Sequence, residues 1–213
     1  MILLKISTDT PPSIIYWLED KLYLNLTNDC TNDCYFCIRK YKSGISRFNL
    51  KLKTEPQSTE IIEELGKVAH RKRWSEFVFC GFGEPTTRLN TLLKVSSWLN
   101  DNYLTPIRIN TNGHALLLYP ERAVATELKV AGIEKLSISL NAHNATVYNK
   151  VCRPKFEDAF EKAVRFIVQA RNSGLNVEIT AVTIPEVSIS QVEKIARDLD
   201  VGFRARPYSP LIW

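Results

Sequence analysis

The sequence lacks the features that would place the protein in a membrane or outside the cell. No stretch approaches the ~18 uninterrupted apolar residues that a membrane-spanning helix needs. The first residues, MILLKISTDTPPS, contain neither the long hydrophobic segment nor the small-residue cleavage site of a signal peptide. Five cysteines, an odd number, argue against a disulfide framework. We therefore expect a cytoplasmic protein with reduced thiols and no membrane partner.

Signs of a second domain are also absent. The 213 residues contain no linker, internal repeat or low-complexity segment, and 45% of them are hydrophobic. A chain of this length can bury one substantial core. We predict a single domain over residues 1–213, with its core at residues 21–208 and an N-terminal edge strand within residues 1–20.

Charge gives little indication of a partner. The net charge is +5, and basic residues concentrate at residues 39–53 and 71–73. The second run ends a predicted helix, where cations complement the helix dipole, and we interpret it as a solvated face. The first run could meet an anionic substrate or a reductase. No motif indicates nucleic acid.

Apolar strands alternate with amphipathic helices along the chain. Strands are predicted at residues 22–26, 76–80, 106–110, 135–140, 177–182 and 203–206. Helices are predicted at residues 58–70, 88–100, 120–132 and 156–167, and after a capping box of Ser188 and Gln191. Six β/α units predict a parallel sheet, whereas a closed eight-unit barrel typically needs ~250 residues. The fold class is therefore α/β, a partial (βα)6 TIM-like barrel, with residues 13–18 as an antiparallel edge strand.

Three cysteines directly follow the first of the six strands. The segment YLNLTNDCTNDCYFCIRK places Cys30, Cys34 and Cys37 at the spacing Cys-x3-Cys-x2-Cys, without a fourth cysteine nearby. Each thiolate can bind one iron of a cubane cluster, so three thiolates leave one iron with an open position. An open metal position permits chemistry, whereas a closed four-ligand site is usually structural.

A zinc-binding interaction module is the non-enzymatic alternative, with the basic loop contacting RNA or a protein. Zinc takes four ligands, typically as two tight pairs. The fourth ligand would have to come from Cys80, Cys152, His70, His114 or His143, and none of these forms a second pair.

Polar residues and glycines follow the later strands, where chemistry gathers in parallel barrels. Residues 81–86 read GFGEPT, in which glycines allow close backbone approach and Glu84 could bind an ammonium group or cap a helix. Asn112, in the turn NTNG, could bind a ligand or only stabilise that turn. Ser139 and Asn141 could share the inner face, whereas we expect Ser137 to be a satisfied interior hydroxyl.

Arginines and cysteines at other strand ends have two interpretations each. Arg204 and Arg206 alternate onto one face, where Arg206 could bind an acidic substrate or form a structural salt bridge. Cys80 ends the second of the six strands and Cys152 opens a predicted helix. We expect both thiols to be buried by packing, although either could donate a hydrogen atom or carry a transferred group.

These motifs together resemble the radical S-adenosylmethionine (radical SAM) superfamily. The Cys-x3-Cys-x2-Cys loop, the Gly-Glu-Pro core and the Thr-Asn-Gly turn all match, although Phe82 interrupts the usual Gly-Gly pair. The blocks LYLNLTNDCTNDCYFCIRK, FVFCGFGEPTTRL, SISLNAHNATVYNKVCRPKF and FRARPY are similar to the small TatD-associated subgroup. Glycyl-radical activating enzymes and 7-carboxy-7-deazaguanine synthase are also short partial barrels, and their activities are the alternatives.

The resemblance implies an enzyme with a [4Fe-4S] cluster and S-adenosylmethionine (SAM). Cys30, Cys34 and Cys37 would be the metal ligands and catalytic residues. Reductive cleavage of SAM would give a 5′-deoxyadenosyl radical that takes hydrogen from an unidentified substrate, with flavodoxin or ferredoxin as electron donor. The residues implied to bind the cofactor are Phe36 beside the adenine and Gly81, Gly83, Glu84, Asn112, Ser139, Asn141 and Arg206 around the rest of SAM.

Overall fold

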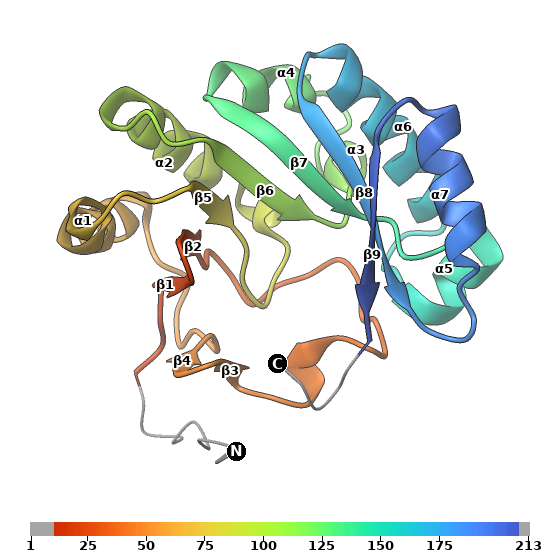
Figure 1. Ribbon diagram of the computed structural model, residues 1–213, viewed down its shortest axis with the longest axis horizontal. Helices are drawn as coiled ribbons and strands as arrows, with labels where there is room; N and C mark the ends of the chain where they lie inside the picture. The colour runs from red at the N-terminus through yellow and green to blue at the C-terminus, as the bar shows by residue number, and fades with distance from the viewer. Residues whose placement is uncertain (1–10, 209–213) are drawn as a thin grey trace.

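Alternation of apolar and polar side chains builds a curved sheet with one covered face. The computed structural model describes residues 11–208. Its main sheet has the order β1-β2-β5-β6-β7-β8-β9, and all pairs from β2 to β9 are parallel (Figure 1). The strands are β1 Ile15–Leu18, β2 Lys21–Leu24, β5 Glu76–Phe79, β6 Ile107–Thr111, β7 Ile133–Ser139, β8 Asn176–Thr183 and β9 Gly202–Pro207. The sheet does not close on itself, so the predicted six-unit partial barrel is confirmed.

The first strand adds an antiparallel edge, as predicted. Tyr16 pairs with Tyr23, and the chain reverses at Glu19, which has a left-handed φ of 53°. A small ribbon of β3 Gly44–Ile45 and β4 Phe48–Asn49 packs beside this edge, where Phe48 lies edge-on to Trp17 with ring centroids 4.9 Å apart.

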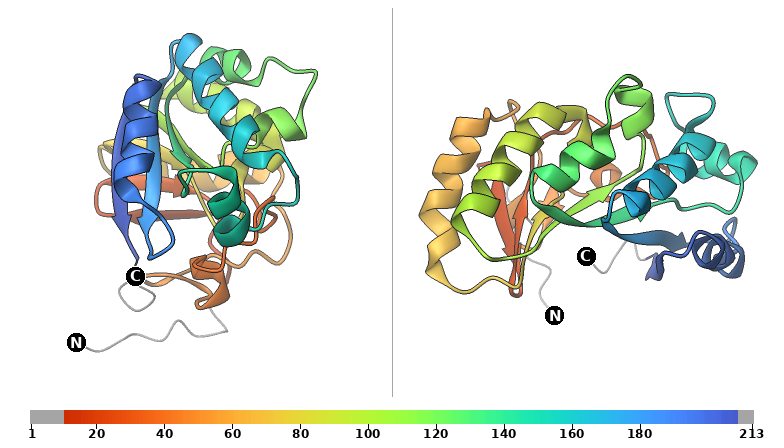
Figure 2. Two further views of the ribbon diagram at one scale, coloured as in Figure 1. Left: turned by 90° about the vertical axis from the view of Figure 1, so that its right-hand side faces the viewer. Right: turned by 90° about the horizontal axis from the view of Figure 1, so that it is seen from above.

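Helices cover the convex face of the sheet. Figure 2 shows them along the outside of the curve. They are α1 Ser58–Val68, α2 Leu89–Asn102, α3 Ala115–Leu118, α4 Val124–Val130, α5 Ala145–Cys152, α6 Ala159–Asn172 and α7 Ile189–Asp198. Leu22, Phe77 and Ile138 are fully buried beneath them, whereas the alternate positions carry polar side chains such as Arg108 onto the concave face. Within residues 11–208, no helix has the length and apolar character to cross a membrane.

The helix predicted to begin at Pro120 begins later. The structure has α3 and α4 in this region, and α4 starts at Val124. The Arg122 amide donates to the Tyr119 carbonyl at 3.1 Å, which closes a turn with Pro120 at its second position. Proline suits that position because its φ is fixed there, so a turn forms in place of the helix start.

The capping box predicted at Ser188 and Gln191 is wrong. Helix α7 does begin after Ser188, but no side-chain capping bond forms there. The Ser188 amide donates to His143 Nδ1 at 3.3 Å, so it does not need the Gln191 side chain. A capping box occurs instead at α1, where the Gln57 amide donates to Glu60 Oε2 at 2.6 Å.

Cys152 ends a helix and does not open one. It is the last residue of α5, a helix that the sequence prediction, which began its helix at residue 156, did not include. Arg153 follows with a left-handed φ of 48°. Because a residue before proline is disfavoured in the helical region, Pro154 reinforces the break between the two helices.

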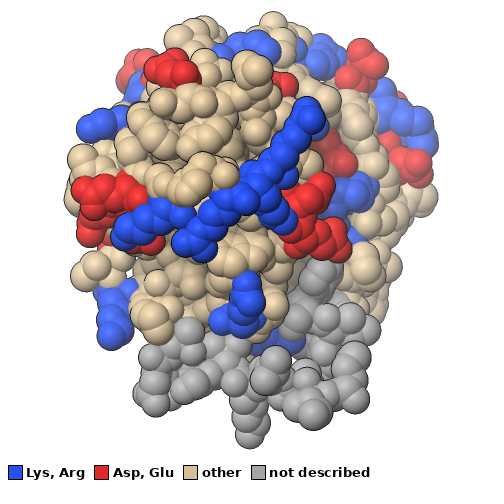
Figure 3. Space-filling view, turned by 60° about the vertical axis from the view of Figure 1, so that its left-hand side comes forward, with Lys and Arg blue, Asp and Glu red and all other residues tan. Residues whose placement is uncertain are grey.

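The predicted basic run at residues 71–73 lies on a surface of mixed charge. Figure 3 shows the side that carries α1, where Lys and Arg side chains form a band with Asp and Glu at both ends. Arg71 Nε donates to the Lys67 carbonyl at 2.8 Å, and Lys72 Nζ donates to the Glu19 carbonyl at 2.6 Å. These contacts agree with the interpretation of a solvated face.

Candidate metal centre

The cysteine loop leaves the carboxyl end of β2 and lies against the end of α5. The Asp33 amide donates to the Cys152 carbonyl at 3.0 Å, and the Tyr35 amide donates to the Val151 carbonyl at 3.2 Å. The Lys155 amide donates back to the Thr31 carbonyl at 2.9 Å. The loop is therefore held in place by a segment that follows it by more than a hundred residues in the sequence.

The three predicted thiols are half-buried and lie close enough to influence one another. Burial raises the pKa of Cys30 to about 12, and burial also raises the pKa of Cys37. The neighbouring Cys34 adds to both shifts. The positive charge of Arg39 acts in the opposite direction on all three cysteines. A cation that favours thiolates at this place supports metal binding, because the thiolate is the ligand form.

Arg39 also fixes the shape of the loop. Its guanidinium donates to the Asn28 carbonyl at 3.2 Å and to the Asn32 carbonyl at 2.8 Å. Lys40 forms an ion pair with Asp33 at 2.7 Å. The start of the predicted basic run is therefore engaged with the loop itself.

Glu84 is the point at which three loops meet. It is 3% exposed, and its Oε1 accepts from the Thr86 amide at 3.0 Å, the Thr86 hydroxyl at 2.7 Å and the Thr111 hydroxyl at 2.7 Å. Its Oε2 accepts from the Asn112 amide at 2.6 Å. Burial raises the pKa of Glu84 while these four donors oppose the shift. The carboxylate thus joins the Gly-Glu-Pro turn to the Asn-Gly turn, and its predicted contact with an ammonium group stays a prediction.

The two predicted glycines of this turn make room for the segment that precedes the cysteines. A Cβ on Gly81 would lie 1.9 Å from Asn25 Oδ1, and a Cβ on Gly83 would lie 2.3 Å from the Asp29 carbonyl oxygen. The Gly83 amide donates to the Thr27 carbonyl at 2.9 Å, and the Glu84 amide donates to the Asp29 carbonyl at 2.7 Å. A side chain at Gly83 would therefore have to displace backbone, whereas one at Gly81 would first displace the Asn25 side chain.

A buried chain of hydrogen bonds runs beneath the cysteine loop. Asn112 Nδ2 donates to Thr31 Oγ1 at 2.7 Å and lies 3.9 Å from Cys30 Sγ. Thr31 Oγ1 is 2.8 Å from His114 Nδ1, and His114 Nε2 is 2.8 Å from the Tyr148 hydroxyl. Burial lowers the pKa of His114 to about 4, so the ring is neutral near pH 7. Asn112 is therefore linked both to the loop and to the helix behind it.

A second group of predicted residues lies at the ends of β7 and β9. Arg206 Nη2 is 3.3 Å from Ser139 Oγ and 3.4 Å from Asn141 Oδ1. Arg206 Nε is buried and has no hydrogen-bond partner among residues 11–208. Burial lowers the pKa of Arg206, while the charges of Cys80 and Cys34 oppose this shift. The predicted cofactor-binding arginine is therefore brought to the cysteine loop, with one donor still available.

The remaining candidates have more ordinary surroundings. Phe36 is half-buried and packs edge-on against Tyr35, with ring centroids 5.5 Å apart. Ser137 Oγ donates to Glu178 Oε1 at 3.1 Å, so it is a satisfied interior hydroxyl as expected. Arg204 forms an ion pair with the same carboxylate at 2.8 Å.

The donor set fits an iron–sulfur cube better than a single zinc ion. In residues 11–208, no three His, Cys, Asp or Glu side chains converge on one ion position. A zinc ion needs such convergence, whereas a cubane cluster takes each thiolate on a different iron. The three thiols are spaced along one loop beside Arg39, so each could bind a different iron of a cubane cluster.

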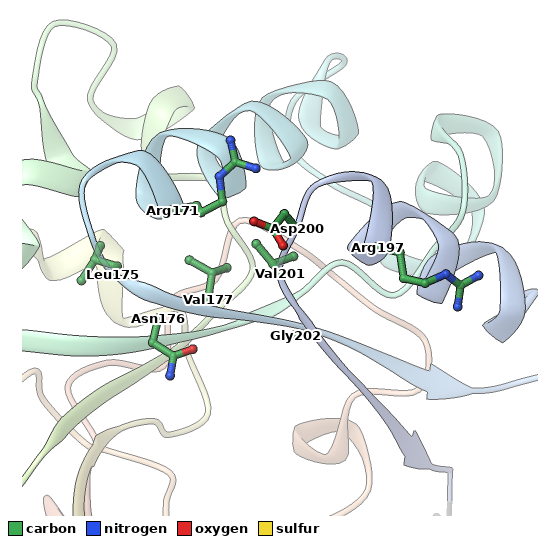
Figure 4. Close-up of a pocket in the computed structure, with 8 residues that line it drawn as sticks. All are labelled: Arg171, Leu175, Asn176, Val177, Arg197, Asp200, Val201 and Gly202. Atoms are coloured by element: carbon green, nitrogen blue, oxygen red, sulfur yellow. The ribbon is translucent and has the colours of Figure 1, made fainter.

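The hollow drawn in Figure 4 is at the other end of the sheet. It measures about 500 Å3 and is lined by the ends of α6 and α7 and the starts of β8 and β9. Arg171 Nη1, at its edge, donates to the Leu199 carbonyl at 2.6 Å. None of the predicted site residues lies in it.

Sequence reasoning missed several residues that organise the site. Arg39 was considered only as part of a basic run, and His114 only as a distant zinc ligand. Thr31 and Tyr148 carried no motif at all. His114 does directly follow the Thr-Asn-Gly turn, which is the one sequence signal that could have indicated its place.

Comparison with known proteins identifies the family. The model of the radical SAM superfamily matches residues 24–199. A probable GTP 3′,8-cyclase of Thermoplasma volcanium is 26% identical over 80% of this chain and 47% of its own length. Its Saccharolobus solfataricus counterpart is 30% identical over 74% of this chain and 45% of its own length. The chain therefore spans about half the length of these curated relatives.

Solved structures share the fold at low sequence identity. Streptococcus suis SuiB superposes with a TM-score of 0.67 at 15% identity, over 89% of this chain and 40% of that chain. Methylornithine synthase gives a TM-score of 0.59 at 18% identity, over 89% of this chain and 53% of that chain. The family match and these enzyme relatives show that the protein is an enzyme. The chain belongs to the radical SAM superfamily, whose members use an iron–sulfur cluster and S-adenosylmethionine.

Proposed function

We propose that this enzyme cleaves SAM reductively and uses the resulting radical to take hydrogen from an anionic substrate. One observation carries the proposal: three half-buried thiols lie on a loop that is bonded to both the Gly-Glu-Pro and the Asn-Gly turns. When bound, the cluster supplies the electron that breaks a carbon–sulfur bond of SAM and yields a 5′-deoxyadenosyl radical. The electron donor would be a flavodoxin or a ferredoxin.

The chain's own residues would hold and orient the cofactors. Cys30, Cys34 and Cys37 would each give one thiolate to a different iron, and Arg39 would offset their negative charge. Arg206, through its unpartnered Nε, would bind a carboxylate at the rim of the sheet, oriented by Ser139 and Asn141. Phe36 would contribute a smaller part of SAM binding as an apolar wall, and so would the backbone of Gly81 and Gly83.

Charge on the concave face supports an anionic substrate. Lys21, Arg108 and Lys135 all surround the Glu76 carboxylate, at 4.0, 2.9 and 3.6 Å. One carboxylate cannot neutralise three cations, so an excess of positive charge remains near the amino ends of β2, β5, β6 and β7, at the opposite end of the concave face from the cysteine loop. Arg206 has no acidic partner among residues 11–208. Phosphate and carboxylate groups are the chemistry that such a face attracts.

The names of the curated relatives are consistent with this substrate class. They are called cyclases of GTP, which is itself a polyanion. Because the chain spans only about half of their length, we propose the class of substrate and not GTP itself. Membership of the TatD-associated subgroup stays a prediction.

The test of SAM cleavage is anaerobic. The protein is reconstituted with iron and sulfide, reduced with dithionite and given SAM, and 5′-deoxyadenosine is measured by chromatography. We expect product from the wild type and from Cys80→Ala, a cysteine outside the loop, and none from Cys34→Ala. A zinc-loaded protein without SAM affinity would contradict the proposal, as would a loaded cluster in Cys34→Ala that cleaves SAM as the wild type does.

The test of the substrate class uses tripolyphosphate and GTP as probes in titration calorimetry. Lys135 is 43% exposed on the concave face, whereas Lys94 is an exposed lysine on α2. We expect Lys135→Ala to weaken binding about tenfold, the effect of one lost charge-assisted contact. Lys94→Ala should leave binding unchanged. Equal weakening in both variants would indicate only a diffuse surface effect and would contradict a site on this face.

A further inference from the structure

Two exposed lysines lie beside the segment that leads into the cysteine loop. Lys51 and Lys53 are exposed, whereas Leu52 between them is buried. The Leu52 amide donates to Asn28 Oδ1 at 3.1 Å, and Asn28 Nδ2 donates back to the Leu52 carbonyl at 2.7 Å. Because Asn28 precedes Cys30 by two residues, this pair of bonds holds both lysines at one edge of the loop.

An exposed arginine lies at the other edge of the same loop. Arg153 follows α5, and its carbonyl accepts from the Asp33 amide at 3.2 Å. The Arg39 guanidinium donates to the carbonyls of both Asn28 and Asn32, at 3.2 and 2.8 Å, so one side chain spans the distance between the two edges. The two lysines and the arginine therefore lie around a single short loop.

The acidic side chains of this loop are already paired. Asp29 forms an ion pair with Lys155 at 3.2 Å, and Asp33 forms one with Lys40 at 2.7 Å. Both carboxylates are exposed, so this side of the loop is open to solvent. Among residues 11–208, neither of the two lysines nor Arg153 forms an ion pair. An excess of exposed positive charge therefore remains around the loop.

The place of this charge favours a protein that delivers electrons. The three half-buried thiols lie on the same loop, so a partner bound here comes close to the metal that they would hold. Opposite charges on two proteins speed their association, and redox partners associate through small interfaces. A nucleic acid suits the surface less well, because the exposed Asp29 and Asp33 would repel its phosphates.

We propose that Lys51, Lys53 and Arg153 form a docking surface for the acidic face of an electron-transfer protein, a flavodoxin or a ferredoxin. In the complex the donor loses one electron and the cluster gains one, and no covalent bond forms or breaks. This inference rests on the proposed function, because it requires a cluster on this loop. It adds the place at which the donor binds.

The test measures the second-order rate constant of cluster reduction in the reconstituted protein, by anaerobic stopped flow. A reduced bacterial flavodoxin and a reduced bacterial ferredoxin are the protein donors, and dithionite is a small reductant that needs no docking surface. In the double variant Lys51→Glu, Lys53→Glu we expect the rate with a protein donor to fall about tenfold, because the attraction is lost. The dependence of this rate on salt should also weaken.

The matched control reverses two charges elsewhere. Lys94 on α2 and Lys129 on α4 are exposed, and the double variant Lys94→Glu, Lys129→Glu changes the net charge by the same amount. Its rates with the protein donors should stay close to those of the wild type, and its rate with dithionite should equal that of the first double variant. Calorimetric titration of the oxidised, reconstituted proteins with oxidised flavodoxin should show weaker binding only in the first double variant.

A single substitution tests the other edge of the loop independently. Arg153→Asn removes the charge and keeps a residue that tolerates the left-handed φ of 48°. We expect a smaller decrease of the rate with protein donors and an unchanged rate with dithionite.

Each other outcome overturns the inference or the proposed function. Equal decreases in the two double variants would attribute the effect to net charge, and wild-type rates in both Arg153→Asn and the first double variant would show that these cations are only solvated. A single-stranded RNA that binds the wild type and loses affinity only in the first double variant would assign the surface to nucleic acid. Failure of both protein donors to reduce a cluster that dithionite reduces would also overturn the docking surface. A wild-type protein that binds no cluster would instead overturn the proposed function, so the two failures are distinguishable.

Discussion

At the scale of single residues, Glu84 shows how one buried carboxylate can connect distant parts of the chain. Its oxygens bond to Thr86, Thr111 and Asn112, and its amide bonds to Asp29. Hydrogen bonds to a charged group each contribute roughly 1.5–3 kcal/mol. The residue was predicted from its motif, but its partners at the end of β6 and in the turn that follows lie 27 and 28 residues away, so sequence spacing could not reveal them.

Gly83 lies so close to the backbone before the cysteines that its replacement gives a testable prediction. In Gly83→Ala the new Cβ would meet the backbone oxygens of Asp29 and Thr27, at 2.3 and 2.6 Å. We expect the variant to lose roughly 1–3 kcal/mol of unfolding free energy through overpacking, and to bind less iron because the segment before Cys30 must move. Urea unfolding and iron analysis measure both effects.

The matched control is a glycine with free space around it. A Cβ on Gly66, inside α1, would meet nothing within 4 Å. Gly66→Ala should therefore gain about 0.5–1 kcal/mol, because alanine is the better helix former, and should keep its iron. Normal iron binding in Gly83→Ala would show that this close approach does not position the cysteines.

His114 predicts a dependence of stability on pH. Burial lowers its pKa to about 4 in the folded protein, below the value of about 6.5 expected when unfolded. Protonation therefore favours the unfolded chain, and stability is lost as the pH falls from 6.5 toward 4. For the metal-free protein we expect this residue to account for a loss of about 2 kcal/mol between pH 7 and pH 5.

Urea unfolding at the two pH values measures this loss. His114→Gln should lack this part of the pH dependence, whereas His70→Gln, which alters an exposed histidine, should retain it. An identical pH dependence in wild type and His114→Gln would contradict the assignment.

At the scale of elements, α5 is the clearest difference between prediction and structure. The sequence analysis predicted a helix at residues 156–167 and none at Ala145–Cys152, where α5 lies. Asn144 marks the start of α5, since its side chain accepts from the Val147 amide at 2.9 Å. The left-handed Arg153 marks its end. Both signals are local, but neither is strong enough alone to indicate a helix of only eight residues.

The cap at Asn144 gives a prediction about this element. Asn144→Ala removes the acceptor for the Val147 amide and should cost about 1 kcal/mol of stability. Asn144→Asp keeps an acceptor and should restore most of it. Asn149 is an exposed residue within the same helix, and Asn149→Ala should not destabilise the protein. Thermal unfolding of the three variants measures the difference, and equal stabilities would show that α5 does not depend on this cap.

At the scale of the whole molecule, the open barrel explains both the site and the exposed concave face. Six parallel strands bring their carboxyl ends to one edge, where the cysteine loop, the two turns and Arg206 meet. The antiparallel β1 and the last strand β9 are the two edges of the sheet, and within residues 11–208 they do not pair with each other. The face between them stays accessible and carries the cations around Glu76.

Cluster removal should lower the stability of the entire fold. The cluster would bind the folded loop, and a ligand present at 100 times its dissociation constant stabilises by about 2.7 kcal/mol. For a chain of this size we expect the melting temperature of the reconstituted protein to exceed that of the metal-free protein by about 5–10 °C. Anaerobic calorimetry measures the shift. Cys34→Ala, taken through the same reconstitution, should show none, and an equal rise in this variant would indicate that iron binds elsewhere.

The sequence by itself determined the order of the elements and the kind of chemistry. Period-two and period-3.6 patterns depend on neighbours within a few residues, so the six strands and most helices were predicted close to their observed ends. The thiols of Cys30, Cys34 and Cys37 and the core of residues 83–85 could be identified because their spacing within one loop is itself the signal. The number of predicted strands and helices indicated a parallel sheet of six β/α units.

Only the tertiary structure decided which residues support the site. Thr31, His114 and Tyr148 are bonded to one another although 83 and 34 residues separate them. The backbone bonds from Asp33 and Tyr35 to Cys152 and Val151 depend on how α5 packs against the loop, which no local pattern encodes. Hydrogen bonds and burial act over a few ångströms in space, and the chain brings such groups together only after the sheet has formed.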